Sequence, residues 1–241
     1  MANTRMTARS VVLSVLLGAH PAWATTAELL RLTADFDIRE STLRVALTRM
    51  VAAGDLVRSQ DGYRLSDRLL ARQRRQDDAL DPPTRTWDGT WKMVVVTAVG
   101  ADARTRAALR TALSHNRFGE LREGVWLRPD NLDVSVPEQV PGMARVLSVR
   151  DQDDAGLAAG LWDLPGWAAA GQRLLSEMEL ATDVPGRFAI AAAMVRHLLT
   201  DPVLPAALLP ADWPGQRLRD GYADFVALLL HRRDAELQEA R

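Results

Sequence analysis

Apolar residues recur three and four positions apart at the start of the chain, which is the spacing of one face of a helix. The first such run covers residues 11–16, and Gly18 and Pro21 follow it as helix-ending residues. A second run begins at Thr25, where Glu28 three positions later completes a capping-box pattern. The pattern therefore predicts two short helices before an Asp-rich turn near residue 35.

A third helix is predicted from about Glu40 to Ala53, ending at Gly54, a residue type that accepts the left-handed conformation. Its apolar side consists of Leu43, Ala46, Leu47 and Met50. Its other side carries small and basic residues: Ser41, Thr42, Arg44, Val45, Thr48, Arg49 and Ala52. An ordinary solvated helix usually mixes Glu with Lys, whereas this face has no acidic residue after Glu40. Small polar side chains permit close approach to base edges and arginine can bind guanine with two hydrogen bonds, so the pattern favours a DNA-recognition helix.

Two short strands are predicted after this helix, in "DLVRS" and "YRLSD", joined through Gln60-Asp61-Gly62. Three helices followed by a hairpin is the order of a winged helix-turn-helix, with the hairpin as the wing. Arg58 and Arg64 would lie on the two wing strands, where they could straddle a phosphate backbone. A winged helix that binds only protein is the alternative interpretation.

The fold class predicted for the whole chain is multidomain α+β. Residues 1–80 form the winged helix-turn-helix, residues 81–150 a ferredoxin-like α+β domain, and residues 151–241 a helical domain. The middle assignment rests on the apolar strand "WKMVVVTAV", an amphipathic helix and three further strands. In the last part, the proline-rich stretch 200–215 is too apolar for a solvated linker and should be an ordered crossing packed on the helices.

Charge is distributed unevenly along a chain whose net charge is only −1. Residues 1–85 hold 13 arginines against 10 acidic residues, and residues 86–241 hold 17 basic against 21 acidic residues. A locally basic first third supports a role for that part at phosphate. With 47% hydrophobic and 25% charged residues the chain is expected to be globular, and without cysteine it has no disulfide or thiolate metal site.

The first 24 residues imitate a secretory signal, because two arginines and an apolar run precede Ala22-Trp23-Ala24. The run is short, Ser14 interrupts it, and cleavage would remove a helix that the winged helix needs for its core. We therefore expect a cytoplasmic protein with this segment retained. No stretch approaches the ~20 apolar residues of a membrane span, so no membrane association is expected.

Catalytic and metal-binding motifs are missing from the sequence. The four histidines have no zinc-site spacing, and neither a phosphate-binding glycine loop nor a G-x-S-x-G motif occurs. Asp151, Asp153 and Asp154 could bind magnesium, but a helix-start turn explains them better. We expect no enzyme, no cofactor and no metal. The rival hypothesis is a metal-dependent nuclease that uses Asp102 or Asp151.

Three groups of motifs, in order, resemble the PaaX family of transcriptional repressors, which is named for control of phenylacetate degradation. The first group is residues 43–50 with Gly54 and Tyr63-Arg64-Leu65; the second is "WDGTWKMVVV" (87–96) and "FGELREGVWLRP" (118–129). The third is "LWDLPGW" (161–167), "RHLLTDPVLPAALLPADWPG" (196–215) and "YADF" (222–225). Arg39 departs from the family pattern, which often has a serine there to cap the recognition helix.

The resemblance implies a homodimer that represses aromatic-catabolism genes at a double-stranded DNA operator. It also implies release by an aryl-CoA thioester, such as phenylacetyl-CoA, and a middle domain similar to CRISPR-adaptation nucleases but without nuclease activity. The effector pocket is not located, although Arg187 and Arg196 beside Phe188 are candidates. The predicted DNA contacts are Arg39, Ser41, Thr42, Arg44, Thr48, Arg49, Arg58, Tyr63 and Arg64. Arg44 is expected to read a base, and Arg49, Arg58 and Arg64 to bind phosphate.

Overall fold

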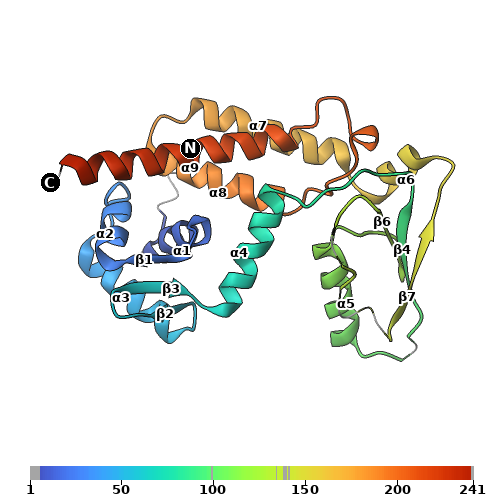
Figure 1. The fold of residues 1–241 in the computed structure, drawn as a ribbon, viewed down its shortest axis with the longest axis horizontal. Helices are drawn as coiled ribbons and strands as arrows, with labels where there is room; N and C mark the ends of the chain where they lie inside the picture. Colours follow the sequence, from blue (N-terminus) through green and yellow to red (C-terminus); the bar gives the residue numbers. More distant parts are fainter. Residues whose placement is uncertain (1–5, 99, 134, 138–139, 141, 240–241) are drawn as a thin grey trace. The chain divides into compact units, whose positions relative to one another are not determined.

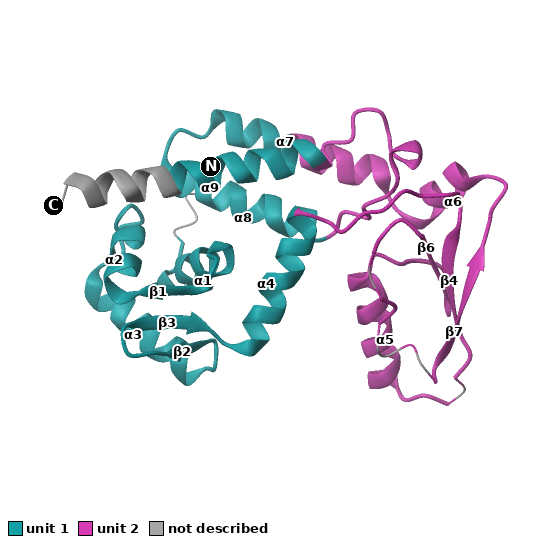
Figure 2. Ribbon diagram, viewed as in Figure 1, with its two compact units in different colours: residues 1–80, 173–199, 216–241 teal, residues 81–172, 200–215 magenta. Residues whose placement is uncertain are grey.

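The computed structural model describes residues 6–98, 100–133, 135–137, 140 and 142–239 (Figure 1). The chain forms two compact units, shown in different colours in Figure 2. The first unit comprises residues 1–80, 173–199 and 216–241, and the second comprises residues 81–172 and 200–215. The division into domains 1–80, 81–150 and 151–241 stays a prediction.

The N-terminal part of the first unit is a winged helix-turn-helix, as predicted. Its elements are α1 (Ala8–Gly18), β1 (Trp23–Thr25), α2 (Thr26–Ala34), α3 (Glu40–Ala52), β2 (Leu56–Arg58) and β3 (Gly62–Leu65). The strands form one antiparallel sheet in the order β1-β3-β2. Figure 1 shows α1, α2 and α3 grouped beside this sheet.

Side chains from all three helices and the sheet build the core of the winged helix. Val12 and Leu16 of α1 and Leu43 and Leu47 of α3 are fully buried in it. The predicted capping box of α2 is present, because Thr25 accepts a hydrogen bond from the Glu28 backbone N–H and Glu28 accepts one from Thr25 in return. Each such cap satisfies backbone groups that a helix start leaves without partners.

Three C-terminal helical segments complete the first unit together with α4 (Asp67–Leu80). They are the second half of α7 (Leu164–Leu180), α8 (Val184–Leu198) and α9 (Gly215–Glu239). The ring of Phe188 on α8 packs edge-on against Phe36 at 5.1 Å and Phe225 at 6.1 Å between centroids. Arg219 Nε donates to the Ala79 carbonyl of α4 at 3.0 Å. The C-terminal helices are therefore part of the same packed body as the winged helix.

The second unit is built on a four-stranded antiparallel sheet in the order β5-β6-β4-β7. Its elements are β4 (Trp91–Val96), α5 (Ala103–His115), β5 (Gly119–Arg122), β6 (Val125–Pro129) and β7 (Ala144–Val149). This connectivity is that of a ferredoxin-like fold, with α5 as the first crossover helix. The described residues between β6 and β7 form no helix, which departs from the full ferredoxin-like pattern.

Both faces of the central strand β4 are covered, which explains its continuous apolar sequence. On one face Val94 packs with Leu109 and Leu113 of α5, as predicted for this amphipathic helix. On the other face Trp91 packs with α6 (Asp154–Leu161) and with the proline-rich segment 200–215, which contains η1 (Ala206–Leu208). That segment is ordered as expected, but it packs on the sheet as well as on helices. In the described residues, no helix is both long enough and apolar enough to cross a membrane.

Candidate nucleic-acid interface

The exposed face of α3 presents the residues that the sequence pattern selected. Leu43, Leu47 and Met50 are buried on the core side. The predicted contact residues on the other side are all exposed: Ser41, Thr42, Arg44, Thr48 and Arg49. Val45, on the same face, leaves 51% of its surface in solvent. α3 thus offers a row of small hydroxyls, one aliphatic side chain and two guanidinium groups, which is chemistry suited to base edges and phosphates.

In the protein without DNA, Arg44 forms an ion pair with Glu40, which lies one helical turn earlier. Glu40 Oε1 accepts a hydrogen bond from Arg44 Nε at 2.8 Å and lies 2.6 Å from Nη2. The face has no acidic residue after Glu40, as the sequence shows, but Glu40 itself supplies one i,i+4 ion pair at the first turn. The i,i+4 spacing is a signal that could have revealed the pair.

Arg39 occupies the N-cap position of α3 without capping it through its side chain, as its chemistry predicts. An arginine side chain has only donors and cannot accept from the orphan backbone N–H groups at a helix start. Among the residues that the structure describes, Arg39, Arg49 and Arg58 have no ion-pair partner. These three guanidinium groups are exposed and available to phosphate.

Strand register places the two wing arginines on opposite faces of the small sheet. Paired residues share a face and successive residues alternate. Tyr63 pairs with Arg58, whereas Arg64 pairs with Val57 on one side and Trp23 on the other. Arg58 and Tyr63 therefore share the side of the sheet that carries the buried Leu56 and Leu65, although Arg58, the last residue of β2, is itself exposed. Tyr63 is half-buried and packs on the hydrophobic core, so its ring is largely used for packing.

The outer face of the wing includes an exposed tryptophan, Trp23, that no sequence motif marks as part of the site. Trp23 and Val57 each leave 37% of their surface in solvent on either side of Arg64. Trp23 Nε1 donates to Ser59 Oγ at 3.1 Å across the sheet, which fixes the orientation of the indole. The turn between the strands covers residues 59–61, and Gly62, predicted as part of the turn, already belongs to β3.

Two buried polar residues, Asp55 and Gln73, hold elements of the winged helix together through hydrogen bonds, and neither was predicted from the sequence. The Asp55 side chain is 3% exposed and accepts hydrogen bonds from Arg9 of α1 (2.8 Å) and Arg68 of α4 (2.5 Å). Gln73 of α4 donates from Nε2 to the carbonyl groups at the end of α1, at Leu16, Leu17 and Ala19. These partners lie far from each other in sequence, so no local pattern predicts them.

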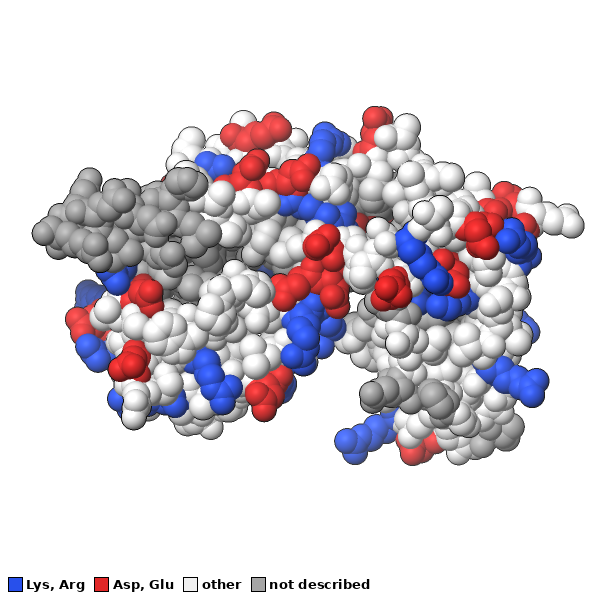
Figure 3. Space-filling view, viewed as in Figure 1, with Lys and Arg blue, Asp and Glu red and all other residues white. Residues whose placement is uncertain are grey.

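Charged side chains of both signs alternate over α3 and the wing in the view of Figure 3. The local excess of arginine therefore does not form one continuous basic patch on this face. Recognition of a DNA sequence would therefore depend on individually placed side chains more than on a broad positive electrostatic field.

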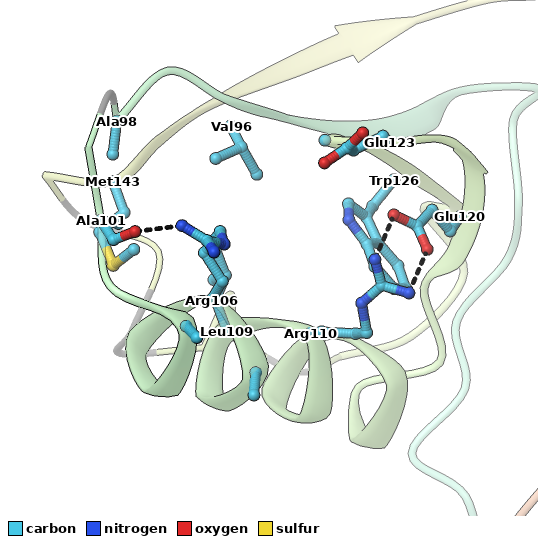
Figure 4. Close-up of a pocket in the computed structure, with 13 residues that line it drawn as sticks. Val96, Ala98, Ala101, Arg106, Leu109, Arg110, Glu120, Glu123, Trp126 and Met143 are labelled. Atoms are coloured by element: carbon cyan, nitrogen blue, oxygen red, sulfur yellow. Dashed lines mark hydrogen bonds and ion pairs between the residues drawn. The ribbon is translucent and has the colours of Figure 1, made fainter.

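A pocket of about 340 Å³ lies in the second unit between α5 and the β5–β6 hairpin. Figure 4 shows Arg110 reaching toward Glu120, with which it forms an ion pair at 3.0 Å, while its guanidinium lies 5.7 Å from the Trp126 ring centroid. Arg106 donates to the Ala101 carbonyl. Glu123 also lines the pocket. Two arginines are thus balanced by two glutamates, and the pocket has no charge preference for an anion.

The slot proposed for an effector beside Phe188 is filled by protein. Phe188 is buried and its ring contacts Phe36 and Phe225. A ligand acyl group could enter there only by displacing one of these rings. Arg196 is exposed, in agreement with an ordinary solvated helix position.

The two aspartates of the nuclease hypothesis have structural roles at turns and helix starts. Asp102 caps α5 by accepting from the Thr105 backbone N–H at 2.7 Å, and this bond holds the pKa of Asp102 below its usual value. Asp151 accepts from the Asp153 backbone N–H, and Asp153 caps α6, as the helix-start interpretation predicted. Within the described residues, no three His, Cys, Asp or Glu side chains are grouped in a way that could hold a metal ion.

Comparisons with known proteins agree with this architecture. Family models match three successive segments: "PaaX-like protein" at residues 7–69, "PaaX protein central Cas2-like domain" at 84–148 and "PaaX-like protein C-terminal domain" at 175–237. A solved structure described as uncharacterized protein Rv0674 from Mycobacterium tuberculosis is 69% identical, with a TM-score of 0.84 over 95% of this chain and 98% of that one. The search of curated proteins gave no match. With its three domain models in order along one chain, the protein belongs to the PaaX-like family of transcriptional regulators.

Proposed function

We propose that the chain is a cytoplasmic, homodimeric repressor of an aromatic-compound catabolic operon. In this proposal α3 enters the major groove of a double-stranded operator and the wing lies along the adjacent backbone. The observation that carries the proposal is the exposed face of α3, where five predicted contact residues stand clear of the core. The exposed guanidinium groups of Arg39, Arg49 and Arg58 support it as phosphate contacts.

An aryl-CoA thioester is the effector in this proposal, by analogy with the family. Release requires that the thioester bind the DNA-free state more tightly than the DNA-bound state. Neither the pocket between α5 and the β5–β6 hairpin nor the filled slot at Phe188 is assigned to it. The effector is therefore proposed from family membership alone.

A footprint of the purified protein on the DNA upstream of its own gene tests the DNA-binding part of the proposal. We expect protection of two half-sites about one helical turn apart, as for other dimeric helix-turn-helix proteins. Protection should weaken steeply as salt rises, because phosphate contacts release counterions. Absence of any protected sequence would leave the protein-binding adaptor as the better explanation.

Repeating the footprint with a panel of acyl-CoA thioesters tests the effector. An aryl-CoA should abolish protection at a concentration where acetyl-CoA and free CoA leave it unchanged. Magnesium should be added in a separate arm, because metal-dependent cleavage of the same DNA that is lost in Asp102→Asn or Asp151→Asn would support the nuclease hypothesis instead.

A further inference from the structure

A carboxylate at the start of a helix that faces DNA has an obvious cost, because it repels phosphate. Glu40 is the first residue of α3, and its side chain is 58% exposed. A negative charge at a helix start stabilises the helix modestly through the macrodipole. The contact with Arg44 indicates a second use for the same carboxylate.

The geometry of the pair leaves one edge of the Arg44 guanidinium open. Glu40 Oε1 contacts Nε at 2.8 Å and Nη2 at 2.6 Å, which is the side edge of the planar group. The end edge, formed by the outer N–H bonds of Nη1 and Nη2, faces neither of these contacts. That edge is a rigid two-donor fork, and such a fork matches the O6 and N7 acceptors of guanine. The Arg44 side chain is 60% exposed, so the fork can be reached.

We propose that Glu40 is a positioning residue that orients Arg44 for reading a base. This inference rests on the proposed DNA-binding function. With Glu40 in place, the fork of Arg44 is presented in one orientation, and guanine satisfies it without breaking the ion pair. On DNA without guanine at that position, we expect Arg44 to turn away from Glu40 toward a phosphate. The abandoned carboxylate then lies near the phosphate backbone, so Glu40 weakens binding to unrelated DNA more than binding to the operator.

The expected size of this effect follows from the exposure of the pair. Exposed ion pairs contribute little by themselves, so replacing Glu40 should change discrimination by about three- to tenfold and not abolish it. Affinity for random DNA should rise, because a repulsive charge is removed and Arg44 becomes free to bind phosphate.

The test is selection of bound duplexes from a library with a randomised 20-base-pair segment, using the full chain. The variants are Glu40→Gln, Arg44→Ala and the double variant, with Asp61→Asn as the charge-matched control. Asp61 lies in the wing turn, is exposed, and has no ion-pair partner among the described residues. We expect Glu40→Gln to weaken, and Arg44→Ala to abolish, the same guanine preference, and the double variant to lose nothing more than Arg44→Ala. Asp61→Asn should leave the selected motif unchanged.

Three results would overturn the inference. A Glu40→Gln motif identical to that of the unaltered chain would show that the carboxylate does not position Arg44. Glu40 would read a base itself if Glu40→Gln lost a preference for cytosine, and if the double variant lost that preference relative to Arg44→Ala as well. An equal change in Asp61→Asn would show a nonspecific charge effect. Failure of the unaltered chain to select any motif would instead overturn the proposed function. Thermal unfolding of each variant, expected to match within a few degrees, shows that α3 remains folded.

Discussion

Arg44 and Arg49 are both exposed on α3, but their surroundings differ. Arg44 is paired with Glu40, and Arg49 has no ion-pair partner among the described residues. We expect Arg44→Ala to weaken operator binding by about 1–3 kcal/mol and to relax sequence choice at one position. Arg49→Ala should weaken binding to operator and random DNA alike and reduce the salt slope by about one. Titrations of both duplexes at several salt concentrations distinguish the two; an equal loss on both duplexes for Arg44→Ala would make it a phosphate contact.

Gly62 is the residue on which closure of the wing sheet depends. A Cβ atom at this position would lie 2.3 Å from the Ala24 carbonyl oxygen of β1, a backbone atom that cannot move alone. We expect Gly62→Ala to separate β1 from β3 and to lower the free energy of unfolding by about 2 kcal/mol or more. Gly54→Ala is the comparison, because Gly54 has φ +70° but open space around it. That change should cost about 1 kcal/mol from conformation alone. Denaturant unfolding of both variants shows which of them loses more free energy of unfolding. A smaller loss for Gly62→Ala than for Gly54→Ala would contradict the steric argument.

Asp130 is expected to make the stability of the second unit depend on pH in the acid range. It forms ion pairs with Arg85 and with Lys92 of β4, the latter at 2.8 Å. Burial would raise the pKa of Asp130, but the hydrogen bonds from Lys92 and Arg85 outweigh it and hold the pKa below its ordinary value of 3.8. A lowered folded-state pKa contributes stability above the unfolded value, and that stability disappears as pH falls through the folded value. We expect Asp130→Asn to reduce the free energy of unfolding at pH 7 and to flatten its fall below about pH 4. If the free energy of unfolding of Asp130→Asn fell as steeply below pH 4 as that of the unaltered chain, other carboxylates would be responsible for the fall.

At the scale of elements, the Gln73 side chain of α4 joins α4 to α1 by binding carbonyl groups at the C-terminal end of α1. Gln73 donates to three carbonyl groups at the end of α1, the shortest bond being 2.8 Å to Ala19. Gln73→Leu would leave these carbonyls without that donor, at a cost of about 1–3 kcal/mol. Hydrogen exchange should rise first at the C-terminal turn of α1. Gln76→Leu is the matched control, because the buried Oε1 of Gln76 accepts no hydrogen bond from the described residues. Equal effects of the two changes would mean that packing and not hydrogen bonding is responsible.

Most elements could be predicted because their signals are local. The apolar spacing of α3, the Thr25 capping box and the apolar run of β4 each lie within one segment and each appears in the structure. The exposed side of α3 follows from the same spacing, since burying Leu43 and Leu47 fixes which residues face solvent.

What the sequence could not predict depends on partners distant in the chain. Asp55 is bound by an arginine 46 positions earlier, and no composition or period selects that arginine. Strand register separates Arg58 from Arg64 by face, and a register is set by tertiary packing as much as by the turn. The division of α7 between two compact units also has no local signal, because the helix pattern runs through it without a break.

At the scale of the whole molecule, the arrangement of α1 bears on the signal-like N-terminus. Five apolar residues within 11–17 of α1 are buried, with Val11, Val12 and Leu16 fully so; the other two are Leu13 and Leu17. Arg9 adds the ion pair with Asp55, and Gln73 holds the end of the helix. Processing after Ala24 would therefore remove a structural helix and not a dispensable leader.

A chain that begins at Thr25 should fail to form a stable winged helix. Among the buried side chains that it lacks are the four core residues Val12, Leu13, Leu16 and Leu17, and each contributes about 1.5–3 kcal/mol when fully buried. Their sum is comparable with the whole stability of a typical domain, about 5–15 kcal/mol. We expect this truncated chain to show no cooperative unfolding of the first unit and no binding to the DNA that the full chain protects. Circular dichroism on heating and the footprint measure these two properties. The N-terminus of the active protein, determined by mass spectrometry, should lie before α1; a form processed after Ala24 that still folds and binds DNA would contradict the role of α1.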